Sequence, residues 1–219
     1  MNWQGGGKNM LNIVLFEPEI PANTGNIGRT CVATGTRLHL IEPLGFRINE
    51  KSLKRAGMDY WKDLDVTTYI NYQDFLDKNP GAKIYMATTK AHKVYTEVDY
   101  EQDCYIMFGK ESAGIPEEIL VDHEEDCMRI PMIGDIRSLN LGNSVAIVLY
   151  EALRQNGFEG MNLNGHLHEH LYAESDDPYY RGISHEGTTG RYKICGYRWR
   201  REDYAYRGSL LYRQCYSSI

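Results

Sequence analysis

The feature that most constrains the fold is a regular alternation of short apolar segments with segments that can form helices. The first apolar segment spans residues 11–16 and is followed by Pro18. An apolar run of this length, bounded by a turn residue, predicts a buried strand. Five further strands are predicted on the same grounds, at residues 37–41, 66–70, 83–88, 103–108 and 126–130.

Helices are predicted between and after these strands, at residues 27–34, 51–56, 72–78, 116–120 and 143–155. Asn71 can cap the third of these helices, and Pro116 suits a first helical turn. Gly157 is placed to end the last one. Strands that alternate with helices indicate an α/β fold with a mostly parallel sheet flanked by helices. Parallel sheets are covered on both faces, which fits strands that are continuously apolar.

The composition divides the chain into three parts. Residues 1–9 contain three consecutive glycines and predict a flexible leader or an expression remnant, and residues 10–160 predict one globular domain. Residues 161–219 form a Tyr- and Arg-rich extension, in which positions 172–219 hold nine of the 17 tyrosines but only five Ile, Leu, Val or Phe. So few aliphatic residues predict a disordered or loosely docked segment. The alternatives are an altered C-terminus, or an RNA-stacking arm that uses the tyrosines with Arg198, Arg200, Arg201 and Arg207.

Charge, hydropathy and cysteine usage exclude several classes of protein. A mean hydropathy of -0.51 and the lack of a long apolar run argue against a membrane span. A net charge of -6 argues against a broadly basic nucleic-acid binder but permits a local basic patch. The five cysteines are widely spaced with no CxxC, which predicts free thiols in a reducing cytosol. No secretory signal is expected. The histidines 166, 168 and 170 could bind a metal, but we expect an ordinary polar stretch there.

Three loops follow predicted strands, at the sheet edge where ligands of α/β proteins gather. In the first, residues 21–30, Asn23 or Thr24 can cap the next helix, and free backbone N–H groups beside Arg29 would suit a phosphate. The alternative is a capped helix with a surface arginine. In the second, residues 108–116, Gly109 would permit close approach of the backbone to a ligand. Glu111 could accept a hydrogen bond there, or it could simply be solvated together with Lys110.

The third loop, residues 130–144, mixes apolar and hydrogen-bonding residues. Ser138, Asn140 and Asn143 supply donors and acceptors, while Ile130, Met132 and Leu139 could hold a flat apolar ring. Loops of this length inside a compact domain are usually functional. The alternative is a long capped connection into the last helix.

Taken together, the three loops carry a pattern that resembles a known family. The pattern consists of Asn23 with Arg29, Gly109-x-Glu111-x-x-Gly114, and Ser138-x-Asn140 before a final helix. It resembles the three motifs of the SPOUT RNA methyltransferases. The closest similarity is to the bacterial tRNA (cytidine/uridine-2'-O-)-methyltransferases that act at the wobble position. Residues 11–21, 39–46, 55–60 and 87–90 also look like that family, so the resemblance extends over residues 10–160.

The resemblance implies a SPOUT-type fold with a C-terminal trefoil knot and a homodimer with the final helix in its interface. It also implies a cytoplasmic enzyme that methylates the ribose 2'-hydroxyl of the wobble cytidine or uridine in the tRNA anticodon stem-loop. The methyl donor would be S-adenosyl-L-methionine, the product S-adenosyl-L-homocysteine, and no metal or membrane would be involved. The alternatives are methylation of another RNA site, a knotted RNA-binding protein without catalysis, and a regulatory module that binds a nucleotide at the first loop.

The resemblance assigns roles to individual residues. Arg29 would contact the reacting hydroxyl or the adjacent phosphate, because arginine stays protonated and is a poor base. Its implied catalytic partners are Asn23, Glu111, Ser138 and Asn140. The implied cofactor-binding residues are Ala87, Gly109, Gly114, Ile130, Met132, Ser138 and Leu139. Contacts to RNA phosphates would need cations, and the candidates are Arg29, Lys51, Lys54, Arg55, Lys90 and Lys110.

Overall fold

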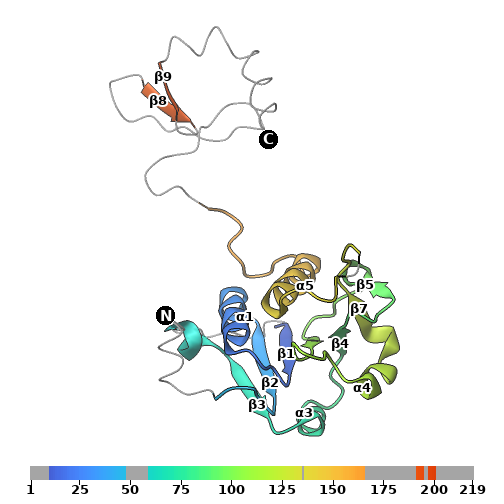
Figure 1. Cartoon of the computed structure of the whole chain (residues 1–219). Helices are drawn as coiled ribbons and strands as arrows, with labels where there is room; N and C mark the ends of the chain where they lie inside the picture. The colour runs from blue at the N-terminus through green and yellow to red at the C-terminus, as the bar shows by residue number, and fades with distance from the viewer. Residues whose placement is uncertain (1–9, 48–58, 135, 166–190, 195–196, 201–219) are drawn as a thin grey trace. The chain divides into compact units, whose positions relative to one another are not determined.

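The computed structural model describes residues 10–47, 59–134 and 136–165, and the backbone of residues 191–194 and 197–200. The chain divides into two compact units, residues 1–161 and 162–219 (Figure 1). The helix predicted at residues 51–56 lies outside the described residues. No described helix is both long enough and apolar enough to cross a membrane.

The first unit contains a seven-stranded sheet in which every pairing is parallel. Its strands are β1 (Asn12–Phe16), β2 (Arg37–Ile41), β3 (Val66–Tyr69), β4 (Ile84–Ala87), β5 (Lys93–Val94), β6 (Tyr105–Phe108) and β7 (Cys127–Arg129). Their order across the sheet is β3-β2-β1-β6-β4-β7-β5. This confirms the predicted α/β class and the six predicted strands, whose observed bounds are up to two residues shorter at an end. The two-residue strand β5 carries no apolar run and was not predicted.

Among the described residues of this unit, four α-helices and three 3₁₀ segments flank or connect the strands. The helices are α1 (Pro21–Thr34), α3 (Tyr72–Lys78), α4 (Glu117–Val121) and α5 (Leu141–Gln155), and the 3₁₀ segments are η1 (Asp59–Asp63), η2 (Tyr95–Glu97) and η3 (Glu124–Asp126). The prediction for α3 is confirmed, since the Asn71 side chain accepts from the backbone N–H of Asp74 at 2.8 Å. Helix α4 begins one residue later than predicted, and Pro116 occupies its N-cap position.

The start of α1 corrects the sequence prediction. The helix begins at Pro21, six residues earlier than expected, and its N-cap is Ile20, which makes no side-chain cap hydrogen bond. The prediction that Asn23 or Thr24 caps the helix is therefore wrong. Proline is favoured at the first helical position because its φ is already fixed at a helical value. As a consequence, Asn23 and Thr24 are buried within the first turn.

Helices cover both faces of the sheet, and β1 shows how the sequence produces this arrangement. Ile13 and Leu15 pack in the same cluster as residues of α1 and α5. Val14 and Phe16 pack in a second cluster with residues of α3 and α4. Figure 1 shows α1 and α5 on one side of the sheet and α3 on the other. Successive residues of a strand point to opposite faces, so a continuously apolar strand supplies both cores.

A chain of buried polar groups crosses the sheet at His39 of β2. The Asn12 amide donates to the carbonyls of Met10, Asp103 and Cys104. Its oxygen therefore accepts from His39 Nε2, at 3.2 Å. The other ring nitrogen, Nδ1, lies 2.8 Å from the Tyr69 hydroxyl, which also accepts from the Asn79 amide at 3.2 Å. A neutral ring satisfies this network, with Nε2 as the donor and Nδ1 as the acceptor.

Burial lowers the pKa of His39 from 6.5 to about 4. The unfolded chain therefore takes up this proton at a higher pH than the folded protein does. The resulting stability is complete above about pH 6.5 and is lost as the pH falls toward 4. We expect the free energy of unfolding to drop by about 2 kcal/mol between pH 7 and pH 5 from this group. Urea unfolding at both pH values measures the drop, and His39→Gln should reduce it. An NMR titration in which the native His39 ring protonates near pH 6.5 would contradict the prediction.

The second unit contains an antiparallel pair of strands, β8 (Arg191–Ile194) and β9 (Tyr197–Arg200). Neither strand was predicted from the sequence. The cysteines of the first unit, Cys31, Cys104 and Cys127, are buried free thiols. Cys195 and Cys215 lie outside the described residues.

Candidate functional site

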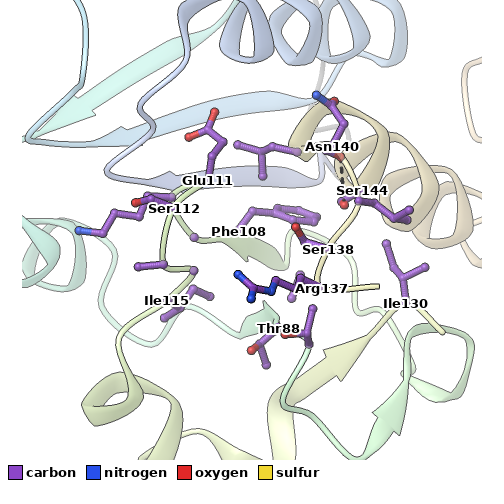
Figure 2. Close-up of a pocket in the computed structure, with 18 of the residues that line it drawn as sticks. Thr88, Phe108, Glu111, Ser112, Ile115, Ile130, Arg137, Ser138, Asn140 and Ser144 are labelled. Carbon is purple, nitrogen blue, oxygen red and sulfur yellow. Dashed lines mark hydrogen bonds between the residues drawn. The ribbon is translucent and has the colours of Figure 1, made fainter. Parts of the chain in front are cut away.

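A pocket of about 630 Å³ lies at the carboxyl ends of β4, β6 and β7. Three loops line it, with residues 88–90 after β4, residues 109–115 after β6, and Ile130, Met132 and residues 137–140 after β7. Ile20 and Asn23 at the start of α1 also line it, and Figure 2 shows several of these residues. These are the ends at which open α/β sheets bind ligands. The volume is within the range of small-molecule and cofactor sites.

The pocket collects residues that the sequence placed far apart. Its lining includes all seven predicted cofactor-binding residues, namely Ala87, Gly109, Gly114, Ile130, Met132, Ser138 and Leu139. Binding of the cofactor by these residues remains a prediction. Four of the five predicted catalytic residues, Asn23, Glu111, Ser138 and Asn140, also line it. The fifth, Arg29, is an exposed residue on α1 and is not among the lining residues.

Gly109 allows the second loop to close on itself. A Cβ at this position would lie 2.0 Å from the Gly114 carbonyl carbon and 2.1 Å from the Ile115 nitrogen. The closed loop is held by the hydrogen bond from the Gly114 N–H to the Lys110 carbonyl, at 2.8 Å. Gly114 itself has φ +74°, which suits glycine. The close approach permitted by Gly109 is thus an approach of the loop's own backbone.

A hydrogen-bond chain connects the three predicted motifs. One Glu111 oxygen accepts from the Glu19 N–H at 2.8 Å, and the other accepts from the Ile20 N–H at 3.3 Å and from the Asn23 amide at 2.8 Å. The Asn23 oxygen then accepts from the Asn140 amide at 3.0 Å. Asn140 also caps α5, because its oxygen accepts from a backbone N–H of the first turn. Glu111 thus supplies the acceptors for the two backbone N–H groups directly before α1, and each amide has one consistent orientation.

Two further contacts fix the second loop against the segment that follows β1. Lys110 Nζ lies 2.8 Å from a Glu17 carboxylate oxygen. The N–H and hydroxyl of Ser112 both donate to Glu19, at 2.8 Å each. The hydrogen bonds from Ser112 lower the pKa of Glu19, and the hydrogen bond to Glu17 raises the pKa of Lys110. Lys110 therefore has a local anionic partner besides any RNA phosphate.

The remaining predicted RNA contacts are placed as follows. Lys90 lines the pocket and forms an ion pair with Glu117. Lys51, Lys54 and Arg55 lie outside the described residues. The pocket therefore presents two lysines that are already paired with carboxylates, which weakens each of them as an isolated phosphate contact.

Arg137 is a pocket residue that the sequence analysis did not select. Figure 2 shows its guanidinium pointing into the space enclosed by the labelled residues. Unlike Lys90 and Lys110, Arg137 forms no ion pair with a described residue. The sequence offered one signal, a cation directly before Ser138 of the third motif. A guanidinium placed in this way suits a carboxylate or phosphate of a ligand.

The described residues contain no cluster of three or more His, Cys, Asp or Glu side chains that could hold a metal ion. The predicted histidine stretch at positions 166–170 lies outside them.

The sequence of this chain matches a known protein family. Residues 10–150 match the model of the SpoU rRNA Methylase family. The chain belongs to this family. The match of the SpoU family model covers the whole seven-stranded sheet and most of α5. It ends before the second unit begins.

Individual proteins are similar over about two thirds of the chain. The tRNA (cytidine(34)-2'-O)-methyltransferase of Escherichia coli K12 is 49% identical over 152 residues, which are 69% of this chain and 97% of that protein. A solved structure concerned with 2-OH methylation of C/U34 on tRNA is 42% identical, with a TM-score of 0.64, and covers 68% of this chain and 97% of that one. An rRNA methyltransferase of Sinorhizobium meliloti with AdoMet bound is 27% identical, with a TM-score of 0.59, over 68% of this chain and 57% of that one.

Proposed function

We propose that this protein transfers a methyl group from S-adenosyl-L-methionine to the ribose 2'-oxygen of the wobble cytidine or uridine in the tRNA anticodon loop. One observation carries the proposal, namely that a single pocket gathers residues of all three motifs. The 49% identity to the Escherichia coli tRNA (cytidine(34)-2'-O)-methyltransferase supports the choice of substrate.

The pocket has the chemistry that this cofactor requires. Ile130 and Leu139 offer apolar surface for an adenine ring, and Ser138 offers a hydroxyl for hydrogen bonding. Arg137 provides a positive charge for the carboxylate of the amino-acid end. When bound, the cofactor supplies a methyl group that its cationic sulfur makes electrophilic.

The task of the protein is then to position the ribose and to assist the loss of its proton. Asn23, Glu111 and Asn140 are mutually fixed by hydrogen bonds and form a rigid polar wall. Rigid donors and acceptors hold a reacting group in line without a cost of reorganisation during the reaction. We assign Arg29 to the RNA phosphate adjacent to the reacting hydroxyl, because it is exposed on the helix that carries Asn23.

Three properties of the assembly belong to the same proposal. The order of the sheet, in which β6 lies between β1 and β4, supports a C-terminal trefoil knot. The exposed residues Ile147 and Tyr150 of α5 support a homodimer formed through this helix. A tRNA substrate supports a cytoplasmic location.

The decisive experiment is nucleoside analysis by mass spectrometry. The full chain is incubated with unmodified tRNA and S-adenosyl-L-methionine, and the RNA is digested. We expect 2'-O-methylcytidine or 2'-O-methyluridine that maps to the wobble nucleotide. Arg29→Ala should reduce the rate at least 100-fold, since the removal of one positioning group costs about 10² to 10³. Arg37→Ala is the matched control, because Arg37 pairs with Asp65 at the start of β2.

Three other results of this experiment would each overturn one part of the proposal. Methylation that maps to another nucleotide or to ribosomal RNA would overturn the substrate but keep the reaction. Binding of tRNA and cofactor without any methylated nucleoside would overturn the enzymatic proposal and favour a non-catalytic RNA-binding protein. An Arg29→Ala variant that is as active as Arg37→Ala would remove Arg29 from the mechanism.

A further inference from the structure

The ribbon formed by β8 and β9 separates its residues by chemical type. Two kinds of cross-strand pair alternate along it. The cationic pairs are Arg191–Arg200 and Lys193–Arg198. The aromatic and aliphatic pairs are Tyr192–Trp199 and Ile194–Tyr197. Because alternate residues of a strand lie on the same face, the register places both cationic pairs on one face and both apolar pairs on the other.

The cationic face destabilises the ribbon when no partner neutralises its charge. Like charges directly opposite each other on paired strands are destabilising, and here two such pairs share one face. The sequence from Arg191 to Arg200 itself contains no acidic residue. A two-stranded ribbon is also only marginally stable without a partner. The arrangement contrasts with the net charge of -6 of the chain, and a polyanion is the partner that would relieve the repulsion.

We propose that the cationic face of the β8–β9 ribbon is a phosphate-binding surface for RNA. The ribbon lies beyond residue 150, where the SpoU family match ends. The choice of RNA as the polyanion rests on the proposed function, because a second RNA contact on one chain raises the local concentration of substrate for the first. Contacts to phosphates fix position and add affinity without reading sequence.

The test neutralises the face in the full-length protein. The variant carries Arg191→Gln, Lys193→Gln, Arg198→Gln and Arg200→Gln. Binding of fluorescent tRNA is followed by anisotropy at several salt concentrations. We expect the dissociation constant to rise at least tenfold at low salt, and the slope of log affinity against log salt to become shallower by about 3 for four lost phosphate contacts. Cofactor affinity and the methylation rate at saturating tRNA should be unchanged.

A matched variant keeps the charge and changes only the side-chain type. Arg191→Lys, Arg198→Lys and Arg200→Lys together should retain the tRNA affinity and most of the salt slope of the wild type. An unchanged affinity and slope in the glutamine variant would overturn the proposal. Charge-dependent binding to vesicles of phosphatidylserine and phosphatidylcholine, with unchanged tRNA binding, would also overturn it and assign the face to membranes. Since anisotropy requires no turnover, a loss of binding in a protein that does not methylate tRNA would refute only the proposed function.

Discussion

Replacement of Gly109 by alanine is expected to destabilise the protein by about 3 kcal/mol, at the upper end for overpacking, and to abolish cofactor binding. The added methyl group would lie 2.0 Å from the backbone of Gly114. Backbone atoms cannot rotate away as a flexible side chain can, so the loop would have to open. Opening would break the hydrogen bond from the Gly114 N–H to the Lys110 carbonyl. It would also move Glu111, which lies between these two residues and holds the start of α1.

Urea unfolding and calorimetric titration with S-adenosyl-L-homocysteine measure the two effects of Gly109→Ala. Gly165→Ala is the matched control, because nothing lies within 4 Å of a Cβ built there. We expect the control to remain within about 0.5 kcal/mol of the wild type. A Gly109→Ala protein with wild-type stability and wild-type affinity for S-adenosyl-L-homocysteine would show that the loop is not closed in the way described. Failure to accumulate as folded protein is the extreme form of the expected result.

The elements that sequence reasoning identified correctly are those specified by local chemistry. An apolar run followed by Pro18 is sufficient to identify β1, and Asn71 with its neighbours is sufficient to identify the start of α3. The start of α1 could not be found in this way. The backbone N–H groups of Glu19 and Ile20, directly before the helix, donate to Glu111, which is 91 residues from Ile20 in sequence. A helix whose preceding residues are held by a distant carboxylate has no local capping signal, and so the helix prediction began too late.

The residues of the site, like the helices and strands, could be predicted only in part from the sequence. The resemblance of the three loops to the SPOUT motifs was sufficient to select Asn23, Glu111 and Asn140 as a set. It could not show that they form one hydrogen-bond chain, since Asn23 and Asn140 are 117 residues apart. Arg137 was missed for a related reason. A single arginine in a loop is usually solvated, and Arg137 is itself exposed. Only the direction of its guanidinium, into the pocket, marks it as a site residue (Figure 2).

Glu111→Gln is expected to weaken the hydrogen bonds that connect the three motifs. Glutamine keeps the size of the side chain but replaces one acceptor oxygen by an NH₂ donor. That donor would face either the Glu19 N–H or the Asn23 amide, both of which are donors. Hydrogen bonds to a charged group contribute about 1.5 to 3 kcal/mol, and we expect a loss of unfolding free energy of that size. Methylation should fall at least tenfold, because Asn23 loses the partner that orients it.

Glu118→Gln is the control for Glu111→Gln, since Glu118 is exposed at the start of α4 and its substitution should leave stability and activity unchanged. Asn140→Ala adds a second test, because Asn23 bridges Asn140 and Glu111 by hydrogen bonds to both. If the three residues act as one unit, the double variant should be about 0.5 to 1 kcal/mol less destabilised than the sum of the two single variants. If the losses of unfolding free energy in the two single variants simply add in the double variant, the motifs are neighbours in the pocket without energetic coupling. The polar wall would then be three separate contacts, and Glu111 would act only at the terminus of α1.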